Sequence, residues 1–247
     1  MDHQQLSRMP FEDYLSPRFD LDNIDRFYVR SSIYAALKAA VPHLSGTLLD
    51  VGCGKMPYKS VLMRPQGRTE KYLGLDLDIP VTEGYAAARP DLLWDGKTIP
   101  LADASVDSVM LTEVLEHCFD PSAVLKETSR VLRKDGFVFI TVPFLWPLHD
   151  VPYDEYRYTP FSLEKHLAGA GYGNIRISAL GGWNASLGQM LALWLNRSGL
   201  PDRRRRWLYR LFLKRVISGL YKRDRKPTNF LDNTYMITGL TALAQKS

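Results

Sequence analysis

The stretch from Leu48 to Gly54 constrains the fold most, because an apolar run stops abruptly at an acid and two glycines. The apolar residues predict a buried strand that ends near Asp50 in a tight turn. Glycines at positions 52 and 54 let the backbone adopt conformations that a Cβ would forbid, and they let a ligand lie against the main chain. Pro57 suits the first turn of a following helix. An ordinary structural turn with two glycines is the alternative.

Apolar runs and helical repeats alternate along the rest of the chain. The further strands are expected at residues 72–76, 92–95, 105–111, 137–143, 173–180 and 233–243. The helices are expected at residues 24–42, 121–132, 160–170 and 185–196, and Asp135-Gly136 is expected to end the second of them. This alternation implies a doubly wound α/β sheet of parallel strands, with its ligand beyond the carboxyl ends of the strands.

The segment from Leu49 to Gly54 resembles motif I of the class I S-adenosylmethionine-dependent methyltransferases, and later segments match that family in the right order. The resemblance covers about residues 45–180 and the final strand. It implies a Rossmann-like, seven-stranded sheet with an antiparallel last strand, to which this chain adds a basic helical insert near its C-terminus. It also implies S-adenosylmethionine as cofactor, bound at the turn by Asp50, Gly52, Cys53 and Gly54.

The second strand ends in an acid, as the first does. By the resemblance Asp76 binds both ribose hydroxyls, and a carboxylate can accept two hydrogen bonds from a cis-diol. Leu77 follows it in the expected cofactor site, and Asp78 is a rival for the role of Asp76.

The third strand also ends in an acid. By its place in the resemblance, Asp95 accepts a hydrogen bond from the adenine amino group, with Trp94 or Ile99 near the ring face. The family more often has alanine after this aspartate, where the chain has Gly96, and an ordinary turn at Asp95-Gly96 is the alternative.

The run from Glu113 to His117 follows the fourth strand and is a fairly specific match to small-molecule methyltransferases of this class. In the family it lines the methionine end of the cofactor and the entrance for the substrate, so Glu113 and His117 join the expected cofactor site. A structural role for His117 is the alternative.

Residues 149–161 follow the fifth strand and combine ionisable and aromatic groups with no helix or strand period, which is typical of an active-site loop. The segment resembles one common among methyltransferases of bacterial polysaccharide and natural-product pathways. His149, Asp154 and Arg157 are the catalytic candidates: His149 as general base on an acceptor hydroxyl, Arg157 as a partner for an acidic or sugar-like group. Positioning alone can supply much of the acceleration, so the base need not be essential. Thr159 is expected to cap the helix that Pro160 begins.

A chain of 247 residues, 45% hydrophobic, is long enough for one large α/β domain. We expect an N-terminal arm and helix over the cofactor site at 1–45, and a methyltransferase domain at 46–247 with a helical insert at 185–226. Tyr28 and Arg30 could close over the cofactor's carboxylate; a core tyrosine and a surface arginine are the alternative. Cys53 and Cys118 show no metal-ligand spacing, so no metal site is expected, and so few cysteines suit a reducing cytoplasm. The N-terminus has no signal pattern, and no apolar run approaches the length of a membrane span.

Basic residues are concentrated at 203–226, a segment that contains eleven Lys or Arg residues and one acid, Asp224. The net charge of this segment is +10, which leaves −5 for the other 223 residues. On a helix, Leu208, Phe212, Val216 and Leu220 would share one side, and Arg206, Arg210 and Lys214 would line another. The segment is either a docked helix with a solvated basic edge or a site for an anionic membrane surface, which would make the protein peripheral to a membrane. RNA is a third partner, but no RNA-binding module accompanies the charge.

The expected function is methyl transfer, most simply O-methylation, to a small-molecule or saccharide acceptor. One rival is a nicotinamide-dependent oxidoreductase, which is disfavoured because Pro57 stands where a dinucleotide fingerprint has its third glycine. The others are a non-catalytic scaffold that binds the cofactor and a methyltransferase acting on RNA. The sequence leaves the acceptor and the oligomeric state open.

Overall fold

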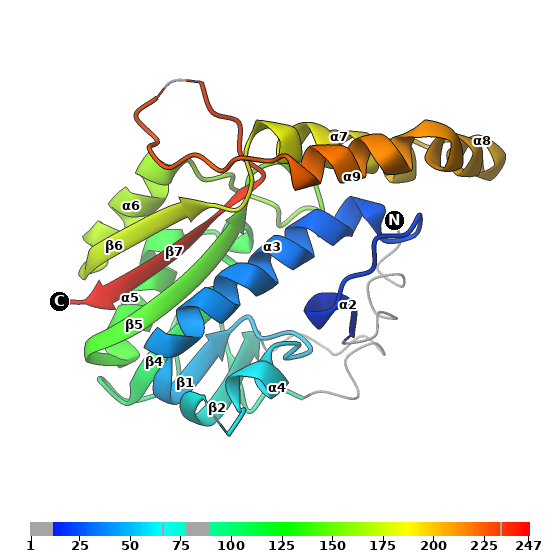
Figure 1. Cartoon of the computed structure of the whole chain (residues 1–247). Helices are drawn as coiled ribbons and strands as arrows, with labels where there is room; N and C mark the ends of the chain where they lie inside the picture. The colour runs from blue at the N-terminus through cyan, green and yellow to red at the C-terminus, as the bar shows by residue number, and fades with distance from the viewer. Residues whose placement is uncertain (1–11, 66, 78–88, 233) are drawn as a thin grey trace.

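The computed structural model describes residues 12–65, 67–77, 89–232 and 234–247 (Figure 1). Within these residues, seven strands form one sheet in the order β3-β2-β1-β4-β5-β7-β6. The strands are β1 (Ser45–Val51), β2 (Arg68–Leu77), β3 (Leu92–Trp94), β4 (Val106–Thr112), β5 (Leu132–Pro143), β6 (Tyr172–Ala179) and β7 (Gly239–Lys246). Strands β1 to β5 pair in parallel, and β7 is antiparallel to both β5 and β6. The predicted seven-stranded α/β sheet with an antiparallel last strand is confirmed.

Helices cover both faces of this sheet (Figure 1). The α-helices are α2 (Glu12–Leu15), α3 (Ile24–Ala40), α4 (Lys59–Leu62), α5 (Pro121–Val131), α6 (Pro160–Gly169), α7 (Trp183–Arg197), α8 (Asp202–Leu208) and α9 (Lys214–Lys222). Short 3-10 turns lie at Val41–His43 and Leu115–His117, and a π-helical turn, η4 (Tyr209–Leu213), joins α8 to α9.

Alternate residues of the central strands enter the two layers of the core. Leu49 of β1 packs with the cluster under α5 and α6, whereas its neighbour Leu48 packs with the cluster under α3. The same alternation separates Val109 from Met110 on β4, as expected because successive side chains of a strand point to opposite faces. Each fully buried leucine contributes about 1.5–3 kcal/mol by leaving water. These two layers hold the central strands, and with them the strand ends, in fixed positions relative to the helices.

The sheet has its topological switch point at β1, because β2 lies on one side of it and β4 on the other. Asp50 lies beside Gly74 of β2 and Met110 of β4 in the two parallel registers. The connections leaving β1 and β4 therefore diverge to opposite faces, and a crevice forms beyond their carboxyl ends, where α/β sheets of this kind bind ligands.

Three element boundaries differ from those expected. α5 ends at Val131 rather than at Asp135-Gly136, because Leu132 already begins β5. β7 begins at Gly239, opposite Pro143, and Pro143 ends the ladder because proline has no N–H to donate; Asn233, where this strand was expected to start, lies outside the described residues. α4 is a single turn whose N-cap is Tyr58, so Pro57 precedes the helix instead of lying in its first turn.

Helices α7, α8 and α9, with the turn η4, form an arm between β6 and β7 that projects beyond the sheet (Figure 1). The helical insert is confirmed. Tyr209, Leu213 and Ile217 are its buried residues, whereas the apolar set one residue earlier is half-buried at Leu208, Val216 and Leu220 and 60% exposed at Phe212. Both sets have four-residue spacing, and packing against Ile24 of α3 and Ala192 of α7 selects the set one residue later. No helix in the described part of the chain is long and apolar enough to cross a membrane.

Asp224 fastens this arm to the body of the protein. Its carboxylate accepts hydrogen bonds from the backbone N–H groups of Gly182 and Ala185, at 2.9 and 2.8 Å, and so caps α7, whose own N-cap Gly182 has no side chain. It also accepts the hydroxyl of Tyr28, and that hydroxyl lies 3.3 Å from the carbonyl of Leu180. The single acid of the basic segment is thus a structural link between α3, α7 and the end of α9.

The N-terminal segment is described from residue 12 onward, so part of the expected arm at 1–45 lies outside the described residues. α3 spans Ile24–Ala40 as expected and packs against α7, β5 and β7. Arg30 lies with its guanidinium 4.2 Å from the ring centroid of Tyr14. For Tyr28 and Arg30 the structure therefore provides packing roles, and the domain limits of 1–45 and 46–247 stay a prediction.

Candidate active site

The candidate residues in the described part of the chain gather beyond the carboxyl ends of the five parallel strands. They follow the strands in order: Asp50, Gly52, Cys53 and Gly54 at β1, Asp76 and Leu77 at β2, Trp94 and Asp95 at β3, Glu113 and His117 after β4, and His149, Asp154 and Arg157 after β5. Asp78, the rival of Asp76, lies outside the described residues. Segments far apart in sequence thus meet at one edge of the sheet.

The glycine turn after β1 is held against β2 on one side and open on the other. The N–H groups of Gly52 and Cys53 donate to the carbonyl of Leu75 at 2.8 and 3.1 Å. A Cβ on Gly52, whose φ is +67°, would lie 2.6 Å from Val114. A Cβ on Gly54, whose φ is +49°, would meet no atom within 4 Å. Gly52 is therefore required by packing, whereas Gly54 leaves space against which a ligand can lie.

Cys53 contributes its backbone to this turn, because its side chain is buried. Its Sγ lies 2.9 Å from where a Cβ on Gly74 would be, so the thiol points toward β2. Burial raises the pKa of this thiol far above its ordinary value, and the carboxylate of Asp50 adds to the effect. Cys53 is a neutral packing group, not a reactive thiolate.

Asp50 is buried at the base of the turn with one oxygen satisfied. Its Oδ2 accepts a hydrogen bond from the hydroxyl of Tyr72, whereas its Oδ1 has no hydrogen-bond partner among the described residues. Burial raises its pKa to about 7, and the bond from Tyr72 opposes this. A buried oxygen without a donor is costly, so Oδ1 is a place where a donor from a bound ligand would be favourable.

Asp76 lies at the rim of the same turn. Its Oδ2 accepts from the N–H of Gly54 and its Oδ1 from the N–H of Leu77, both at 2.8 Å. Each carboxylate oxygen has a further lone pair, so acceptor capacity remains for a diol. Leu77 is 43% exposed and adds an apolar wall beside Gly96.

The end of β3 combines a buried aromatic residue with a turn. Trp94 is buried in the core cluster under α5 and α6 and is the register partner of Leu77 of β2. Asp95 forms the ordinary turn that was the alternative, because its Oδ1 accepts from the N–H groups of Lys97 and Thr98 at 2.8 and 2.9 Å. These two bonds lower its pKa. The adenine role of Asp95 stays a prediction.

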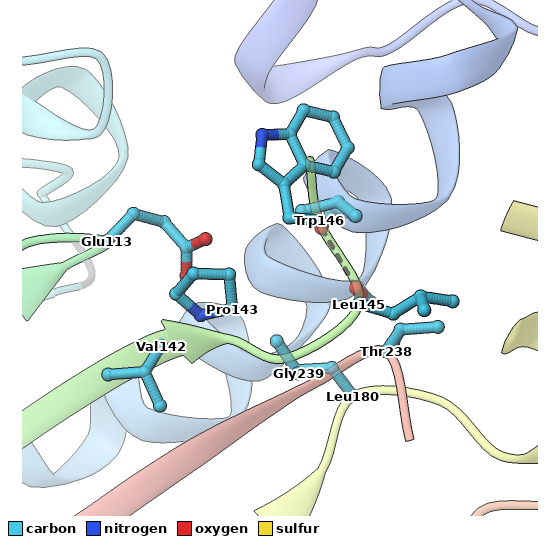
Figure 2. A pocket seen from close by; sticks show the side chains of 10 residues that line it. Glu113, Val142, Pro143, Leu145, Trp146, Leu180, Thr238 and Gly239 are labelled. Carbon is cyan, nitrogen blue, oxygen red and sulfur yellow. Dashed lines mark hydrogen bonds between the residues drawn. The ribbon is translucent and has the colours of Figure 1, made fainter. Parts of the chain in front are cut away.

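Glu113 follows β4 in a left-handed conformation, with φ of +56°. Its Oε1 accepts from the hydroxyl of Thr141 at 2.9 Å, and burial raises its pKa to about 7. It lines a small pocket between α3 and the ends of β5 and β7, with a cavity volume of about 10 Å³ (Figure 2). Pro143, Trp146 and Leu180 are among its mainly apolar lining residues. Strained backbone of this kind is typical of functional sites.

The loop after β5 is bound to the segment after β4 by backbone hydrogen bonds. The carbonyl of Glu116 accepts from the N–H groups of Glu155 and Tyr156 at 2.8 and 3.1 Å. The hydroxyl of Tyr158 donates to the carbonyl of Leu115 at 2.9 Å. His117 Nδ1 lies 3.0 Å from the carbonyl of Tyr153, and its ring centroid lies 4.7 Å from that of His149. The two histidines are brought together by this pairing of segments.

Asp154 is the centre of the three catalytic candidates. Its carboxylate accepts from both terminal nitrogens of Arg157, at 2.6 and 2.8 Å, and lies 3.2 Å from Nδ1 of His149. Burial alone would raise the pKa of Asp154, but these contacts outweigh it and lower the pKa to about 2. Burial, followed by the charge of His117, lowers the pKa of His149. Arg157 is committed to Asp154, so its expected contact with an acceptor stays a prediction.

Three residues of the site were not among the candidates. Tyr72 holds Asp50, Asp150 lies with its Oδ2 3.9 Å from Nε2 of His117, and Glu116 is completely buried beside that histidine. Glu116 stood within a recognised motif, and its place after a strand end could have drawn attention to it. Nothing local in the sequence indicates the other two, because their neighbours come from other strands.

Comparison with known proteins agrees with this arrangement. Residues 49–140 match the family described as "Methyltransferase domain". The chain is 34% identical over 102 residues to the malonyl-[acyl-carrier protein] O-methyltransferase of Serratia marcescens, covering 40% of this chain and 39% of that protein. It is 33% identical over 103 residues to the ubiquinone biosynthesis O-methyltransferase of Paracidovorax citrulli, covering 38% and 42%. The matches therefore span less than half of these relatives.

The fold extends further than the sequence similarity. A crystal structure of an S-adenosylmethionine-dependent methyltransferase from Archaeoglobus fulgidus superposes with a TM-score of 0.56 at 15% identity, covering 99% of this chain and 100% of that one. At this identity the likeness concerns the fold alone. Residues 49–140 thus match a methyltransferase domain, and the seven-stranded sheet with its antiparallel last strand has the class I methyltransferase fold.

Proposed function

We propose that the protein transfers a methyl group from S-adenosylmethionine to a hydroxyl of a small-molecule or saccharide acceptor. One observation carries the proposal: Gly54 leaves open space beside the Asp76 carboxylate, with the unpartnered Oδ1 of Asp50 buried at the base of the same turn. The turn thus offers carboxylate oxygens that can accept hydrogen bonds, and it lets a ligand lie directly against the backbone at Gly54. Both features suit a nucleoside with a cationic amino-acid tail.

The protein's contribution to the reaction is to hold donor and acceptor in line. The bound cofactor supplies a sulfonium methyl: a bond forms between the acceptor oxygen and this carbon as the carbon–sulfur bond breaks. Asp76 would hold the ribose, and the turn at Gly52 to Gly54 would fix the nucleoside relative to the end of β4. Such positioning accounts for a large part of the acceleration in reactions of this kind.

His149 is the group best placed to take the acceptor's proton. Its Nδ1 faces Asp154 at 3.2 Å, so Nε2 is the ring nitrogen left to act as base. Asp154 fixes the orientation of the ring, and Arg157 fixes Asp154. This resembles the general arrangement in which a base is oriented by a third group. Glu113, beside the apolar pocket, would border the space between donor and acceptor.

Calorimetric titration with S-adenosylhomocysteine tests the cofactor assignment. We expect saturable binding to the full chain, weakened at least tenfold by Asp76→Ala and unchanged by Asp202→Ala, which removes an exposed acid on α8. NAD serves as the parallel ligand. Preference for NAD, or no binding of S-adenosylhomocysteine, would refute the proposal.

Turnover separates an enzyme from a scaffold that only binds the cofactor. With labelled S-adenosylmethionine and a panel of hydroxylated saccharides and phenols, we expect label in an acceptor and a slower reaction for His149→Gln. Tight binding with no transfer to any acceptor, including RNA, would favour the scaffold. Transfer to RNA alone would replace the proposed acceptor class.

The arm supports a second part of the proposal, attachment to an anionic membrane surface. Every exposed position of α7 carries a large apolar side chain: Trp183, Leu187, Met190 and Trp194. Their spacing puts them on one face of the helix. On α8 and η4, Trp207 and Leu211 are about as exposed as these. They lie in the segment 203–226, whose arginines and lysines give it a net charge of +10. Apolar and aromatic groups flanked by arginines suit the boundary between anionic headgroups and acyl chains.

Flotation with vesicles tests this attachment. We expect binding to vesicles containing phosphatidylglycerol, and little binding to phosphatidylcholine alone. The pair Leu187→Asp and Met190→Asp should weaken it at least tenfold, whereas Phe161→Asp on α6, a residue exposed to a similar degree, should not. Equal binding of all variants would refute the proposal. If the pair instead changes the sedimentation coefficient without vesicles, the face is covered by a second copy of the chain.

A further inference from the structure

Glu116 is the least explained charged group in the described part of the protein. Its side chain is completely buried, and neither carboxylate oxygen has a hydrogen-bond partner among the described residues. A buried carboxylate without donors is strongly unfavourable unless a proton or a cation neutralises it. The site therefore has a place for a positive charge.

Two histidines stand next to this carboxylate. Nε2 of His117 lies 3.8 Å from Oε1 of Glu116. One ligand atom from each of Glu116, His117 and His149 can be chosen so that all three lie within 4.8 Å of one another. Two imidazoles and one carboxylate are a common set of protein ligands for zinc and related divalent metals.

The other ring nitrogens are already oriented as metal sites require. Nδ1 of His117 lies 3.0 Å from the carbonyl of Tyr153, and Nδ1 of His149 lies 3.2 Å from Asp154. Ligating histidines almost always donate their second N–H to a carbonyl or a carboxylate, which leaves Nε2 neutral for the metal. Arg157 in turn holds Asp154 with two hydrogen bonds. Both histidines thus already have the outer hydrogen-bond partners that metal ligands usually have.

We propose that Glu116, His117 and His149 bind one divalent transition-metal ion, with zinc as the reference metal. The neutral nitrogen donors favour zinc over magnesium, which prefers oxygen ligands and retains its waters. Binding draws the ligand atoms inward, because zinc lies about 2.0–2.2 Å from nitrogen and oxygen ligands. Asp150, whose Oδ2 lies 3.9 Å from Nε2 of His117, is partly exposed and borders the open side. The sequence did not predict this site because its ligands are histidines and an acid, not spaced cysteines.

The ion gives the site a second way to activate an acceptor. A metal on the open side would bind the acceptor oxygen and favour loss of its proton to solvent water, as metal ions do for bound water. In that case His149 holds the ion and is not itself the base. This role rests on the proposed methyl transfer, whereas the metal site itself does not.

Metal binding to the protein without cofactor tests the site. The tag-free full chain, treated with a chelator and dialysed, is titrated with Zn²⁺ by calorimetry and with Co²⁺ by visible absorption. We expect one equivalent bound and a Co²⁺ spectrum of low symmetry. His117→Asn and Glu116→Gln should each weaken binding at least tenfold. His166→Asn, a histidine that contacts Ser122 instead, should bind as the wild type does.

Two controls keep the result clear. The first is thermal unfolding without metal, which checks that each variant is folded. The second is the choice of His117, whose side chain is 25% exposed and so tolerates replacement better than the buried Glu116. Absence of saturable binding, or equal binding by His117→Asn, would overturn the proposal. S-adenosylhomocysteine binding is measured on the same samples. Its absence in the wild type refutes the methyltransferase function, whereas absence of metal binding alone leaves that function with His149 as base.

Discussion

The two halves of the site are built from different parts of the chain. The cofactor half, after β1 and β2, uses backbone groups and glycines: N–H groups of Gly52 and Cys53 fix the turn, and Gly54 leaves the space. The acceptor half, after β4 and β5, uses buried charged side chains centred on Asp154 and Glu116. The backbone contacts of the cofactor half depend on a short local motif. The charged side chains of the acceptor half depend on partners from distant segments. The two should therefore respond differently to substitution.

The largest effect is expected at Asp154. Asp154→Ala removes the partner of Arg157 and His149 at a carboxylate whose side chain is 2% exposed. Breaking a buried ion pair costs about 3–5 kcal/mol. We expect a loss of this order in the free energy of unfolding, measured by denaturant titration, and S-adenosylhomocysteine binding that stays close to wild type wherever the variant is folded. A large loss of cofactor binding would show that the halves are not separable.

Gly54 tests the cofactor half. A Cβ on Gly54 meets no protein atom, so Gly54→Ala should keep the fold at a cost of about 1 kcal/mol for the left-handed residue, and yet fill the space of the ligand. We expect at least a tenfold loss of S-adenosylhomocysteine affinity by calorimetry. Gly199→Ala is the matched control, because Gly199 also has positive φ and an open Cβ position. Similar affinity in both variants would contradict the ligand's place at Gly54.

Asp50 links the cofactor half to pH. Its pKa is about 7 in the folded protein and near its ordinary value of 3.8 in the unfolded chain. The folded state therefore holds this proton longer, and its stabilisation is full below pH 4 and lost as the pH rises through 7, by at most about 1.4 kcal/mol per pH unit. The difference in free energy of unfolding between Asp50→Asn and wild type should therefore be more favourable to the variant at pH 8 than at pH 5. The same difference at both pH values, measured by denaturant titration, would disprove the raised pKa of Asp50.

The smallest effect is expected at Thr159, next to the acceptor loop. Its side chain accepts from the N–H of Ser162 and forms a capping box at the start of α6. Thr159→Ala should lower the free energy of unfolding by about 1 kcal/mol, as loss of an N-cap does. Cofactor affinity should stay unchanged in the same calorimetric assay. A change in affinity would give this residue a role beyond the helix.

Local signals were sufficient for much of the fold and for the turn after β1. The run ending in Asp50 and Gly52 marks a strand and its turn within a few residues, and the N-cap at Thr159 is equally local. The seven-stranded sheet with an antiparallel last strand follows from the alternation of strands and helices together with the resemblance to class I methyltransferases. The pairing of Glu116 with His149 could not be predicted in this way, because it depends on hydrogen bonds between two loops. Which side of the basic segment is buried could not be predicted either, since two apolar stripes with the same spacing compete and only the packing partner decides.

The hydrogen bonds of Asp224 connect the arm to the candidate active site. One carboxylate joins the start of α7 to Tyr28, and the hydroxyl of Tyr28 also contacts the carbonyl of Leu180, a wall residue of the pocket beside Glu113. A displacement of the arm would therefore move Leu180 through only a few hydrogen bonds. Any surface that binds the arm would then also affect the shape of the pocket.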